Sequence, residues 1–364
     1  MTDRARKKFV LTAGGTGGHV FPAEALAREL IEEGCDISFI TDRRGGSFSG
    51  KFPQTAVHRV FARGYAGKNA VSKLWGLFLL GIGVLQSLWI LKRLKPDAVV
   101  GFGGYAAFPA SFAATLLGIP LILHEQNAVL GGANRVLAPR CRLIATTFPS
   151  VSRIPAGIPT VYTGVPVRPD ILALNARPYP PVTPPFEILI TGGSQGAKIF
   201  SGIVPDALKM LPETFRAGLK ITQQCRPADM PRVAKAYENS GLNVELAPFF
   251  SDMPDRLEKA HLVICRAGAS TIAELAVSGR PAVLVPILHA ADGHQRANAL
   301  FLAEAGGAWL CTEPEFTPDW LAFKIQELFH NPKMLITASV SAKRCGNPDA
   351  AKRLAQAVLQ TAGG

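Results

Sequence analysis

The sequence contains few of the residue patterns that hold metal ions or disulfides. Its six cysteines are scattered, and it has no Cys-x-x-Cys pair, no Cys/His cluster and no Asp-x-Asp pair. These absences argue against a zinc site and a disulfide framework, and they favour a reduced compartment. A nucleotide diphosphate held through a metal also lacks its usual sequence support. We therefore expect no metal and no cofactor.

The chain also lacks an apolar segment ahead of its first expected strand. Residues 1–8 are Met-Thr-Asp-Arg-Ala-Arg-Lys-Lys and lead directly into an apolar run. A secretory signal needs an apolar region of about 7–15 residues at this place. We therefore expect the protein to stay in the cytoplasm.

Acidic residues are scarce in the first part of the chain. Residues 1–165 hold 19 Lys and Arg against 9 Asp and Glu, a net charge of +10, whereas residues 166–364 hold 20 against 18, a net charge of +2. A basic half next to a nearly neutral half suggests an anionic partner, either nucleic acid or an anionic membrane. Nucleic-acid binding predicts aromatics interleaved with cations, and residues 1–70 offer few, mostly at core-like spacing. We therefore expect no nucleic-acid partner.

Glycine is abundant at two places that resemble each other. Phe9–Thr12 is an apolar run that ends in Gly14-Gly-Thr-Gly-Gly-His19 and is followed by apolar residues at helical spacing. Glu187–Thr191 ends in Gly192-Gly-Ser-Gln-Gly196, with a helix expected from about Lys198. Both read as strand, tight turn and helix, and the bare amides at such a helix start suit an anion. One phosphate-binding turn in each half is the simplest interpretation.

Expected strands and helices alternate through both halves, which predicts two parallel sheets, each covered by helices on both faces. At about 150 residues per domain, a chain of 364 residues allows two domains. Residues 159–186 hold eight prolines and form the best candidate for a linker. The expected strands lie at residues 9–12, 36–40, 97–101, 120–123, 143–146, 187–191, 219–222, 244–246, 261–264 and 281–285.

Residues 74–91 form an uncharged apolar segment flanked by Lys68 and Lys73 before it and by Lys92, Arg93 and Lys95 after it. Its length would allow it to span a bilayer. A span would place two strands of one sheet on opposite sides of the membrane, which argues against it. The segment is otherwise a buried crossover helix or a helix partly exposed to bind lipid, and the flanking cations favour the last reading.

Gly192–Gly196 also matches Gly-x-Ser-x-Gly, the nucleophile elbow of α/β-hydrolases. Ser194 would be the nucleophile, with Asp252 or Asp292 and His289 or His294 as partners in the right chain order. The duplicate turn at Gly14 argues against this alternative, because Thr16 would be a redundant second nucleophile.

Polar clusters follow several of the expected strands. His124-Glu-Gln-Asn127 comes directly after an apolar strand, and Glu125 is a candidate base or hydroxyl acceptor. His19 ends the first glycine turn, either as a hydrogen-bond donor or as a general base. Glu274 belongs either to a capping box with Ser270 or Thr271, or to a site that accepts from a ribose diol. His289–Asn298 is a further polar loop, and a metal site there lacks a third ligand.

Taken together, these motifs make the chain similar to a known family, the UDP-N-acetylglucosamine transferases of peptidoglycan synthesis, over residues 9–360. The residues that carry the resemblance are Gly14–His19, Gly101–Tyr105, His124–Asn127, Gly164–Arg168, Gly192–Ala197, Cys265–Thr271 with Glu274, and His294–Gln295 with Asn298. Members of that family transfer GlcNAc to undecaprenyl-pyrophosphoryl-MurNAc-pentapeptide, converting lipid I to lipid II. The resemblance implies inner-membrane association at the cytoplasmic face, with anionic lipids as peripheral partners.

The resemblance also implies a GT-B fold of two Rossmann-like domains that face each other across a cleft. Residues 1–165 would face acceptor and membrane, residues 166–345 would hold UDP-GlcNAc, and residues 346–364 would return to the first domain as a helix. His19 and Glu125 would be the catalytic candidates. UDP-GlcNAc would contact Thr16, Gly17, Gly18, Asn127, Arg168, Ser194, Gln195, Gly196, Phe250, Ala269, Ser270, Glu274 and Gln295. The acceptor diphosphate would contact Gly14, Gly15, Gly103, Gly104 and Tyr105.

The chemistry that this family performs fits those residue types. Negative charge grows on the diphosphate as the sugar C1 leaves it, and helix-start amides with an arginine stabilise that charge. The incoming hydroxyl needs a base such as His19 or Glu125. Direct attack by the acceptor would invert the anomeric carbon.

Overall fold

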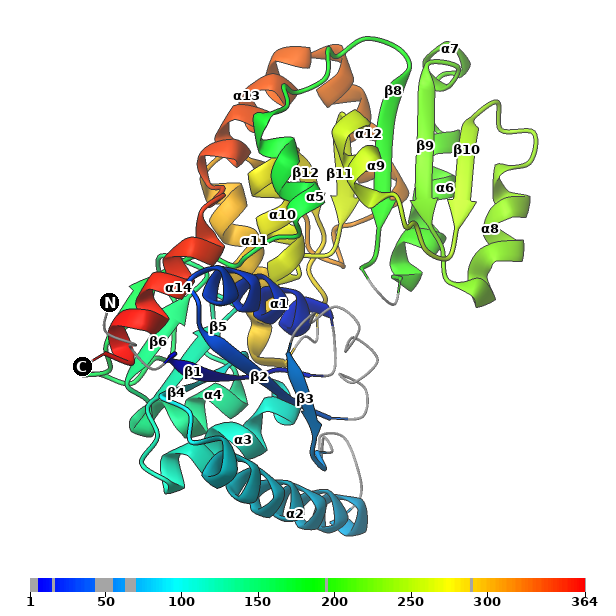
Figure 1. The fold of residues 1–364 in the computed structure, drawn as a ribbon. Coiled ribbons are helices and arrows are strands. Elements are labelled where there is room, and N and C mark those ends of the chain that lie inside the picture. The colour runs from blue at the N-terminus through cyan, green and yellow to red at the C-terminus, as the bar shows by residue number, and fades with distance from the viewer. Residues whose placement is uncertain are drawn as a thin grey trace. The chain divides into compact units, whose positions relative to one another are not determined.

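The computed structural model describes residues 6–14, 17–42, 55–62, 70–193, 196–288 and 291–363. The chain divides into two units, one formed by Met1–Arg168 with Asp349–Gly364 and the other by Pro169–Pro348. Each unit has its own parallel sheet and is described by itself (Figure 1).

The first unit alternates strands and helices. In chain order its elements are β1 (Lys8–Thr12), α1 (Gly17–Glu32), β2 (Asp36–Thr41), β3 (Ala56–Arg59), α2 (Ala70–Leu94), β4 (Ala98–Gly101), α3 (Gly104–Leu116), β5 (Leu121–Glu125), α4 (Gly132–Leu137), the 3-10 turn η2 (Ala138–Arg140), β6 (Leu143–Thr146), β7 (Thr160–Tyr162) and α14 (Ala350–Thr361). The strand order is β3-β2-β1-β4-β5-β6-β7, with every pair parallel.

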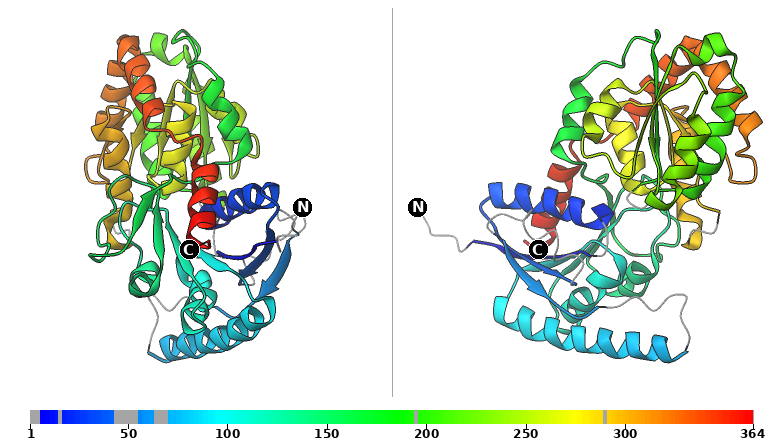
Figure 2. Two further views of the ribbon diagram at one scale, coloured as in Figure 1. Left: turned by 60° about the vertical axis from the view of Figure 1, so that its left-hand side comes forward. Right: turned by 90° about the vertical axis from the view of Figure 1, so that its right-hand side faces the viewer.

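Alternate residues of the strands in this sheet face two separate apolar layers. Phe9 and Leu11 of β1 pack with Leu26 of α1 and with Leu354 and Val358 of α14. Val10 faces the other layer, built from apolar residues of α2, α3 and α4. Figure 2 shows α14 lying beside α1, so the end of the chain completes the helical cover of the first sheet. Burial on both faces explains why these strands read as continuous apolar runs in the sequence.

Helix α2 is a crossover helix with one buried and one exposed face. Gly83, Ser87 and Leu91 are buried, and a Cβ atom at Gly83 would lie 1.9 Å from the carbonyl oxygen of Phe61. Gln86 accepts a hydrogen bond from the Phe61 amide at 2.9 Å. The opposite face leaves large apolar side chains exposed, namely Leu74, Trp75, Leu77, Phe78, Leu85 and Trp89. By length and composition Leu74–Leu94 could cross a membrane, but α2 connects β3 and β4 of one sheet and packs on α3.

The second unit repeats the alternation. Its elements are α5 (Pro169–Leu172), η3 (Ala173–Ala176), β8 (Phe186–Thr191), α6 (Lys198–Lys209), α7 (Glu213–Arg216), β9 (Leu219–Gln224), η4 (Pro227–Asp229), α8 (Met230–Tyr237), β10 (Asn243–Ala247), α9 (Met253–Lys259), β11 (Leu262–Cys265), α10 (Ala269–Ser278), β12 (Ala282–Leu284), η5 (Ala291–Gly293), α11 (His294–Glu304), β13 (Ala308–Leu310), α12 (Pro318–His330) and α13 (Pro332–Arg344).

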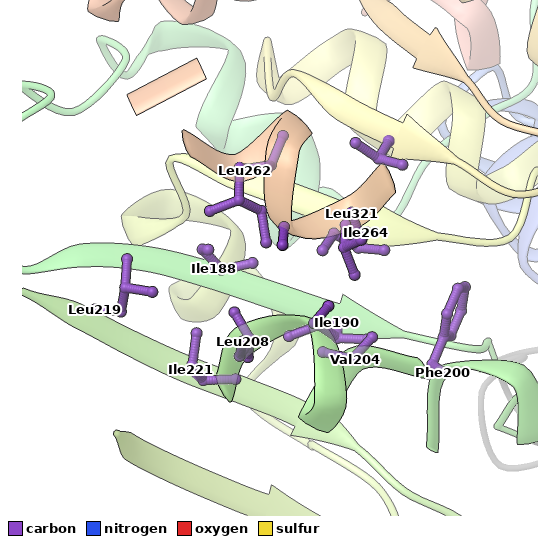
Figure 3. Packing of buried hydrophobic residues seen from close by; sticks show 14 of the residues in the cluster. Ile188, Ile190, Phe200, Val204, Leu208, Leu219, Ile221, Leu262, Ile264 and Leu321 are labelled. Carbon is purple, nitrogen blue, oxygen red and sulfur yellow. The ribbon is translucent and has the colours of Figure 1, made fainter. Parts of the chain in front are cut away.

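The second sheet has the parallel order β10-β9-β8-β11-β12-β13. Figure 3 shows its core, where Ile188 and Ile190 of β8 and Ile221 of β9 lie against Val204 and Leu208 of α6. Apolar residues of α8, α12 and α13 complete the same cluster. The two doubly wound parallel sheets confirm the predicted α/β fold class.

Three sequence expectations need correction. β3, β7 and β13 were not predicted, and β7 takes up residues 160–162 of the proline-rich stretch within which the two units divide. β5 continues through His124 and Glu125, which were expected to follow the strand. The N-cap of α10 is Gly268, which has no side-chain cap, so the capping-box reading of Ser270 or Thr271 with Glu274 is wrong.

Candidate active site

The first glycine turn lies at the switch point of the first sheet. β1 and β4 are neighbours there, and the chain leaves them in opposite directions along the sheet. Ligands of open α/β sheets bind at the carboxyl ends of the strands at such a point. A Cβ atom at Gly14 would lie 2.4 Å from the Cβ of Ala106, so only glycine lets the turn pack on α3. Gly15 and Thr16 lie outside the described residues, and Gly17 and Gly18 begin α1.

The loop after β4 adds a second helix start to this edge of the sheet. Gly103 and Gly104 have φ angles of 74° and 73°, a left-handed conformation that glycine adopts without strain. Gly103 is the N-cap of α3 and gives it no side-chain cap, so the first amides of the helix have no capping side chain. Tyr105 follows in the first turn of α3 and is half-buried. Amides at a helix start with the dipole behind them attract an anion.

His19, on α1, is held at this edge by Gln126, the first residue after β5. Its Nδ1 lies 2.9 Å from Oε1 of Gln126. Its Nε2 lies 3.5 Å from where a Cβ atom of Gly104 would be, so the ring faces the start of α3. Burial lowers the pKa of His19, while the bond to Gln126, the charge of Glu125 and the Phe102 carbonyl act in the opposite direction. His19 is therefore neutral at neutral pH and able to accept a proton.

Glu125 is saturated with hydrogen bonds. It is 2% exposed. Oε1 accepts from the backbone amide of Asn127 at 2.9 Å and from its Nδ2 at 3.3 Å. Oε2 accepts from the Gly131 amide at 2.9 Å and from Nδ2 of Asn134 at 2.8 Å. The carboxylate thus fixes the loop between β5 and α4, and with it the position of Asn127. This geometry favours His19 over Glu125 as the base.

Arg168 ends the first unit. Its guanidinium lies 5.8 Å from the ring centroid of Phe21 on α1, so it packs near the helix that follows the first glycine turn. Arg168 belongs to the first unit, as do Asn127 and the first glycine turn, whereas the remaining expected donor contacts belong to the second.

The second glycine turn follows β8 at the switch point of the second sheet, where β8 and β11 are neighbours. Gln224 of β9 holds the start of the turn. Its Oε1 accepts from Thr191 Oγ1 at 2.9 Å and from the Gly192 amide at 3.0 Å, and its Nε2 donates to the Gly193 carbonyl at 2.8 Å. A Cβ atom at Gly196 would lie 2.8 Å from Cγ of Arg226, so that cation lies beside the turn. Ser194 and Gln195 lie outside the described residues.

The other expected donor contacts come from neighbouring segments of the second unit. Ala269, Ser270 and Glu274 lie on α10, which follows β11. Phe250 is buried, with the Arg256 guanidinium 4.0 Å from its ring centroid. Gln295, in the first turn of α11, accepts from the Ile287 amide at 3.1 Å. These residues all follow carboxyl ends of strands β8 to β12, where a nucleotide is expected to bind.

Among the described residues no group of three or more His, Cys, Asp and Glu is placed to hold a metal ion. His289 lies outside the described residues, whereas His294 begins α11.

Sequence reasoning did not assign roles to Gln126, Gln224 or Arg226. Gln126 stood within a motif that was noted only as polar. Gln224 was missed because the strand was expected to end at Thr222, although a polar side chain at the end of an otherwise apolar strand is the signal that finds such residues.

Comparisons with known proteins agree with this architecture. The glycosyltransferase family 28 N-terminal domain matches residues 9–146, and the family 28 C-terminal domain matches residues 187–354. A crystal structure of MurG from Acinetobacter baumannii aligns with a TM-score of 0.78 at 34% identity, covering 97% of this chain and 99% of that one. A UDP-GlcNAc 2-epimerase from Neisseria meningitidis aligns with a TM-score of 0.68 at 16% identity, covering 97% of this chain and 100% of that one, which shows the fold alone.

Two relatives bear the name UDP-N-acetylglucosamine–N-acetylmuramyl-(pentapeptide) pyrophosphoryl-undecaprenol N-acetylglucosamine transferase. The one from Rhodospirillum rubrum is 50% identical over 356 residues, covering 97% of this chain and 92% of its own. The one from Rhodospirillum centenum is 51% identical over 359 residues, covering 98% and 94%. None of these comparisons supports the hydrolase alternative. The chain therefore belongs to glycosyltransferase family 28, with a GT-B fold, and within it to the family of these N-acetylglucosamine transferases.

Proposed function

We propose that this protein transfers GlcNAc from UDP-GlcNAc to the 4-hydroxyl of MurNAc in undecaprenyl-pyrophosphoryl-MurNAc-pentapeptide, converting lipid I to lipid II. The observation that carries this proposal is the identity of about half of all positions with transferases of that name over nearly the whole chain. It is a UDP-GlcNAc-dependent glycosyltransferase of peptidoglycan synthesis.

The second unit holds the donor in this proposal. Ser194 and the amides after it, through Gln195 and Gly196 to the start of α6, receive the UDP diphosphate. Glu274 accepts from the ribose, Phe250 meets the uracil through its backbone, and Ala269, Ser270 and Gln295 line the remainder. The contacts of Gln224 support this assignment, because it accepts from the Gly192 amide and donates to the Gly193 carbonyl, which fixes the backbone of the turn before any ligand arrives.

The first unit holds the acceptor and the base. Gly14, Gly15, Gly103, Gly104 and Tyr105 face the acceptor diphosphate, while Thr16–Gly18 and Asn127 contact the GlcNAc. Arg168 approaches the leaving diphosphate.

His19 accepts the proton of the MurNAc hydroxyl as that oxygen bonds to C1 of GlcNAc. The bond from C1 to the UDP oxygen breaks with its electron pair passing to UDP, so the configuration at C1 inverts.

Helix α2 supports association with the membrane that carries the acceptor. Its exposed face is apolar, and Lys92, Arg93 and Lys95 are exposed at its end. A surface pocket between β3 and α2 has both apolar and basic side chains in its lining. Its lining residues are Val57, His58, Arg59, Leu85, Gln86, Trp89 and Ile90. In this proposal the protein binds peripherally to anionic lipids at the cytoplasmic face of the inner membrane, and it serves cell wall growth, cell shape and division.

The test is transfer by the purified protein. We expect label from UDP-GlcNAc to appear in lipid-linked GlcNAc-MurNAc only when the lipid-linked muramyl acceptor is supplied, and UDP-GlcNAc alone to stay intact. Labelled UDP-GlcNAc that remains unchanged with acceptor, or that yields only free GlcNAc, would contradict the proposal.

A further inference from the structure

We infer that Gln126 is the positioning residue that fixes the tautomer of His19, so that Nε2 is the nitrogen that takes the acceptor's proton. This inference rests on the proposed role of His19 as base. It starts from a buried glutamine, 3% exposed, that contacts His19, Phe102 and His124 at one time.

The orientation of the Gln126 amide follows from a partner of fixed polarity. One end of the amide lies 2.9 Å from the carbonyl oxygen of Phe102. A carbonyl oxygen can only accept, so this end must be the Nε2 amino group. The other end is then Oε1, which can only accept. Because Oε1 lies 2.9 Å from Nδ1 of His19, Nδ1 must carry the proton. In the neutral imidazole the lone pair then resides on Nε2.

The contacts of His124 independently require the same orientation of the Gln126 amide. Its Nε2 lies 3.1 Å from the carbonyl oxygen of Gly164, which can only accept, so Nε2 of His124 carries a proton. Its Nδ1 is therefore an acceptor and lies 3.2 Å from Gln126. The group of Gln126 that faces His124 must be a donor, which again places the amino group there. Two carbonyl oxygens at different places thus require one orientation of Gln126.

The assigned tautomer directs the basic nitrogen toward the acceptor side. Nε2 of His19 is the ring atom nearest to the Cβ position of Gly104, at the start of α3. When Nε2 takes the hydroxyl proton, the ring becomes a cation and its Nδ1–H bond to Gln126 becomes charge-assisted. A neutral amide stabilises that cation without the large increase in pKa that a carboxylate in its place would cause. The titratable groups whose charges reach His19 are Glu125 and His124.

The first experiment needs no variant. Histidine-selective ¹⁵N labelling, with His19 assigned by its loss in a His19→Ala protein, reports which ring nitrogen carries the proton. We expect the Nδ1–H tautomer alone at neutral pH in the protein without substrates. A resonance pattern showing the proton on Nε2 would overturn the inference.

The second experiment removes the contact. In Gln126→Met the new side chain is close in volume to glutamine and offers no amide oxygen to accept from Nδ1 of His19. We therefore expect mixed tautomers of His19 and a kcat lowered by up to about tenfold, with the KM for UDP-GlcNAc unchanged. The acidic limb of kcat should move to lower pH, because the bond to Gln126 raises the pKa of His19. The matched control is Gln223→Met, a buried glutamine bonded to Tyr237 in the second unit, which should lower stability but leave the pH profile unchanged.

The outcomes separate the inference from the proposed function. If His19→Ala abolishes transfer while Gln126→Met keeps the kcat, the pH profile and the tautomer of the wild type, Gln126 is not the positioning residue and the function stands. If His19→Ala transfers GlcNAc at the wild-type rate, the proposed base itself is wrong.

Discussion

The two glycine turns share a backbone plan but differ in what surrounds them. Near the first turn, His19 and His124 both contact Gln126. The carboxylate of Glu125 accepts from the amide of Asn127, the residue after Gln126. Beside the second turn lie Gln224, which bonds to the backbone of the turn, and Arg226, which is paired with Asp229. The first unit thus carries titratable groups beside its turn, whereas the groups that hold the second turn bond to its backbone or to each other. In the proposed function, the chemical step therefore belongs to the first unit and donor binding to the second.

A buried glutamine lies near each turn, and the two glutamines make different contacts. Gln126 bonds to two histidine side chains, whereas Gln224 bonds to amides and carbonyls of the turn itself. A neutral amide can donate and accept at once without adding a charge. Variants of Gln126 and of its histidine partners should therefore change kcat and pH dependence, whereas variants around the second turn should change KM.

The largest expected effect is at His19. Removal of a general base costs roughly 10²- to 10⁴-fold in rate, and we expect His19→Ala to lower kcat by that factor with the KM for UDP-GlcNAc within about twofold. Steady-state kinetics with a lipid-linked acceptor measures both constants. Glu125→Gln is the companion variant: a larger loss of kcat there with an intact fold would move the base to Glu125 and reverse the assignment made above.

The second prediction tests the charge difference between the units. Reversal of Lys92, Arg93 and Lys95 to glutamate should weaken binding to anionic vesicles by roughly a hundredfold, since each cation near an anionic leaflet contributes about 1 kcal/mol. Sedimentation with vesicles of defined anionic lipid content measures the partition.

A matched control reverses Lys235, Lys259 and Lys333, which are exposed on the second unit. Equal losses for both triple variants would mean that net charge alone, and not the end of α2, governs binding to the membrane.

The third prediction concerns the second unit. Glu274→Ala should raise the KM for UDP-GlcNAc about tenfold or more with kcat little changed, because a hydrogen bond to a charged group contributes about 1.5–3 kcal/mol. Glu274→Gln keeps an acceptor oxygen, so its KM for UDP-GlcNAc should lie between those of the wild type and Glu274→Ala. An unchanged KM in Glu274→Ala, with an unchanged melting temperature, would remove Glu274 from the donor site.

The sequence predicted most of the strands, and the ones it missed have a common cause. β3 and β7 are the two edges of the first sheet, and β13 is one edge of the second. They have three or four residues, and β3 reads Ala-Val-His-Arg with no fully buried position. An edge strand is short and only partly covered, so the apolar signal that reveals a central strand such as β1 is weak.

The turns at Gly14 and Gly192 could be predicted because each turn needs glycine itself, and a glycine can be read directly from the sequence. The contact between His19 and Gln126 could not be predicted, since it joins residues 107 positions apart, one near the start of α1 and the other directly after β5. Glu125 was selected as a candidate base, but its four hydrogen bonds come from the loop and from α4, which a local pattern does not reveal. Residue types could be predicted here, whereas the direction of each hydrogen bond could not.

The last prediction concerns acid stability of the first unit. Burial lowers the pKa of His124 to about 4 from an ordinary value of 6.5. Because the folded protein resists protonating this ring and the unfolded chain does not, its contribution to the free energy of unfolding is complete above pH 6.5. That contribution is lost as the pH falls from 6.5 toward 4.

His124→Gln keeps one donor and one acceptor but cannot titrate. Between pH 7 and pH 5 the free energy of unfolding should fall in both proteins. We expect the fall to be about 1–2 kcal/mol smaller in the variant than in the wild type, since one pKa unit corresponds to about 1.4 kcal/mol. Calorimetric melting at the two pH values measures the difference. A parallel decline in both proteins would mean that other histidines of lowered pKa, His19 and His58 in this unit or His261 in the second, dominate the acid response.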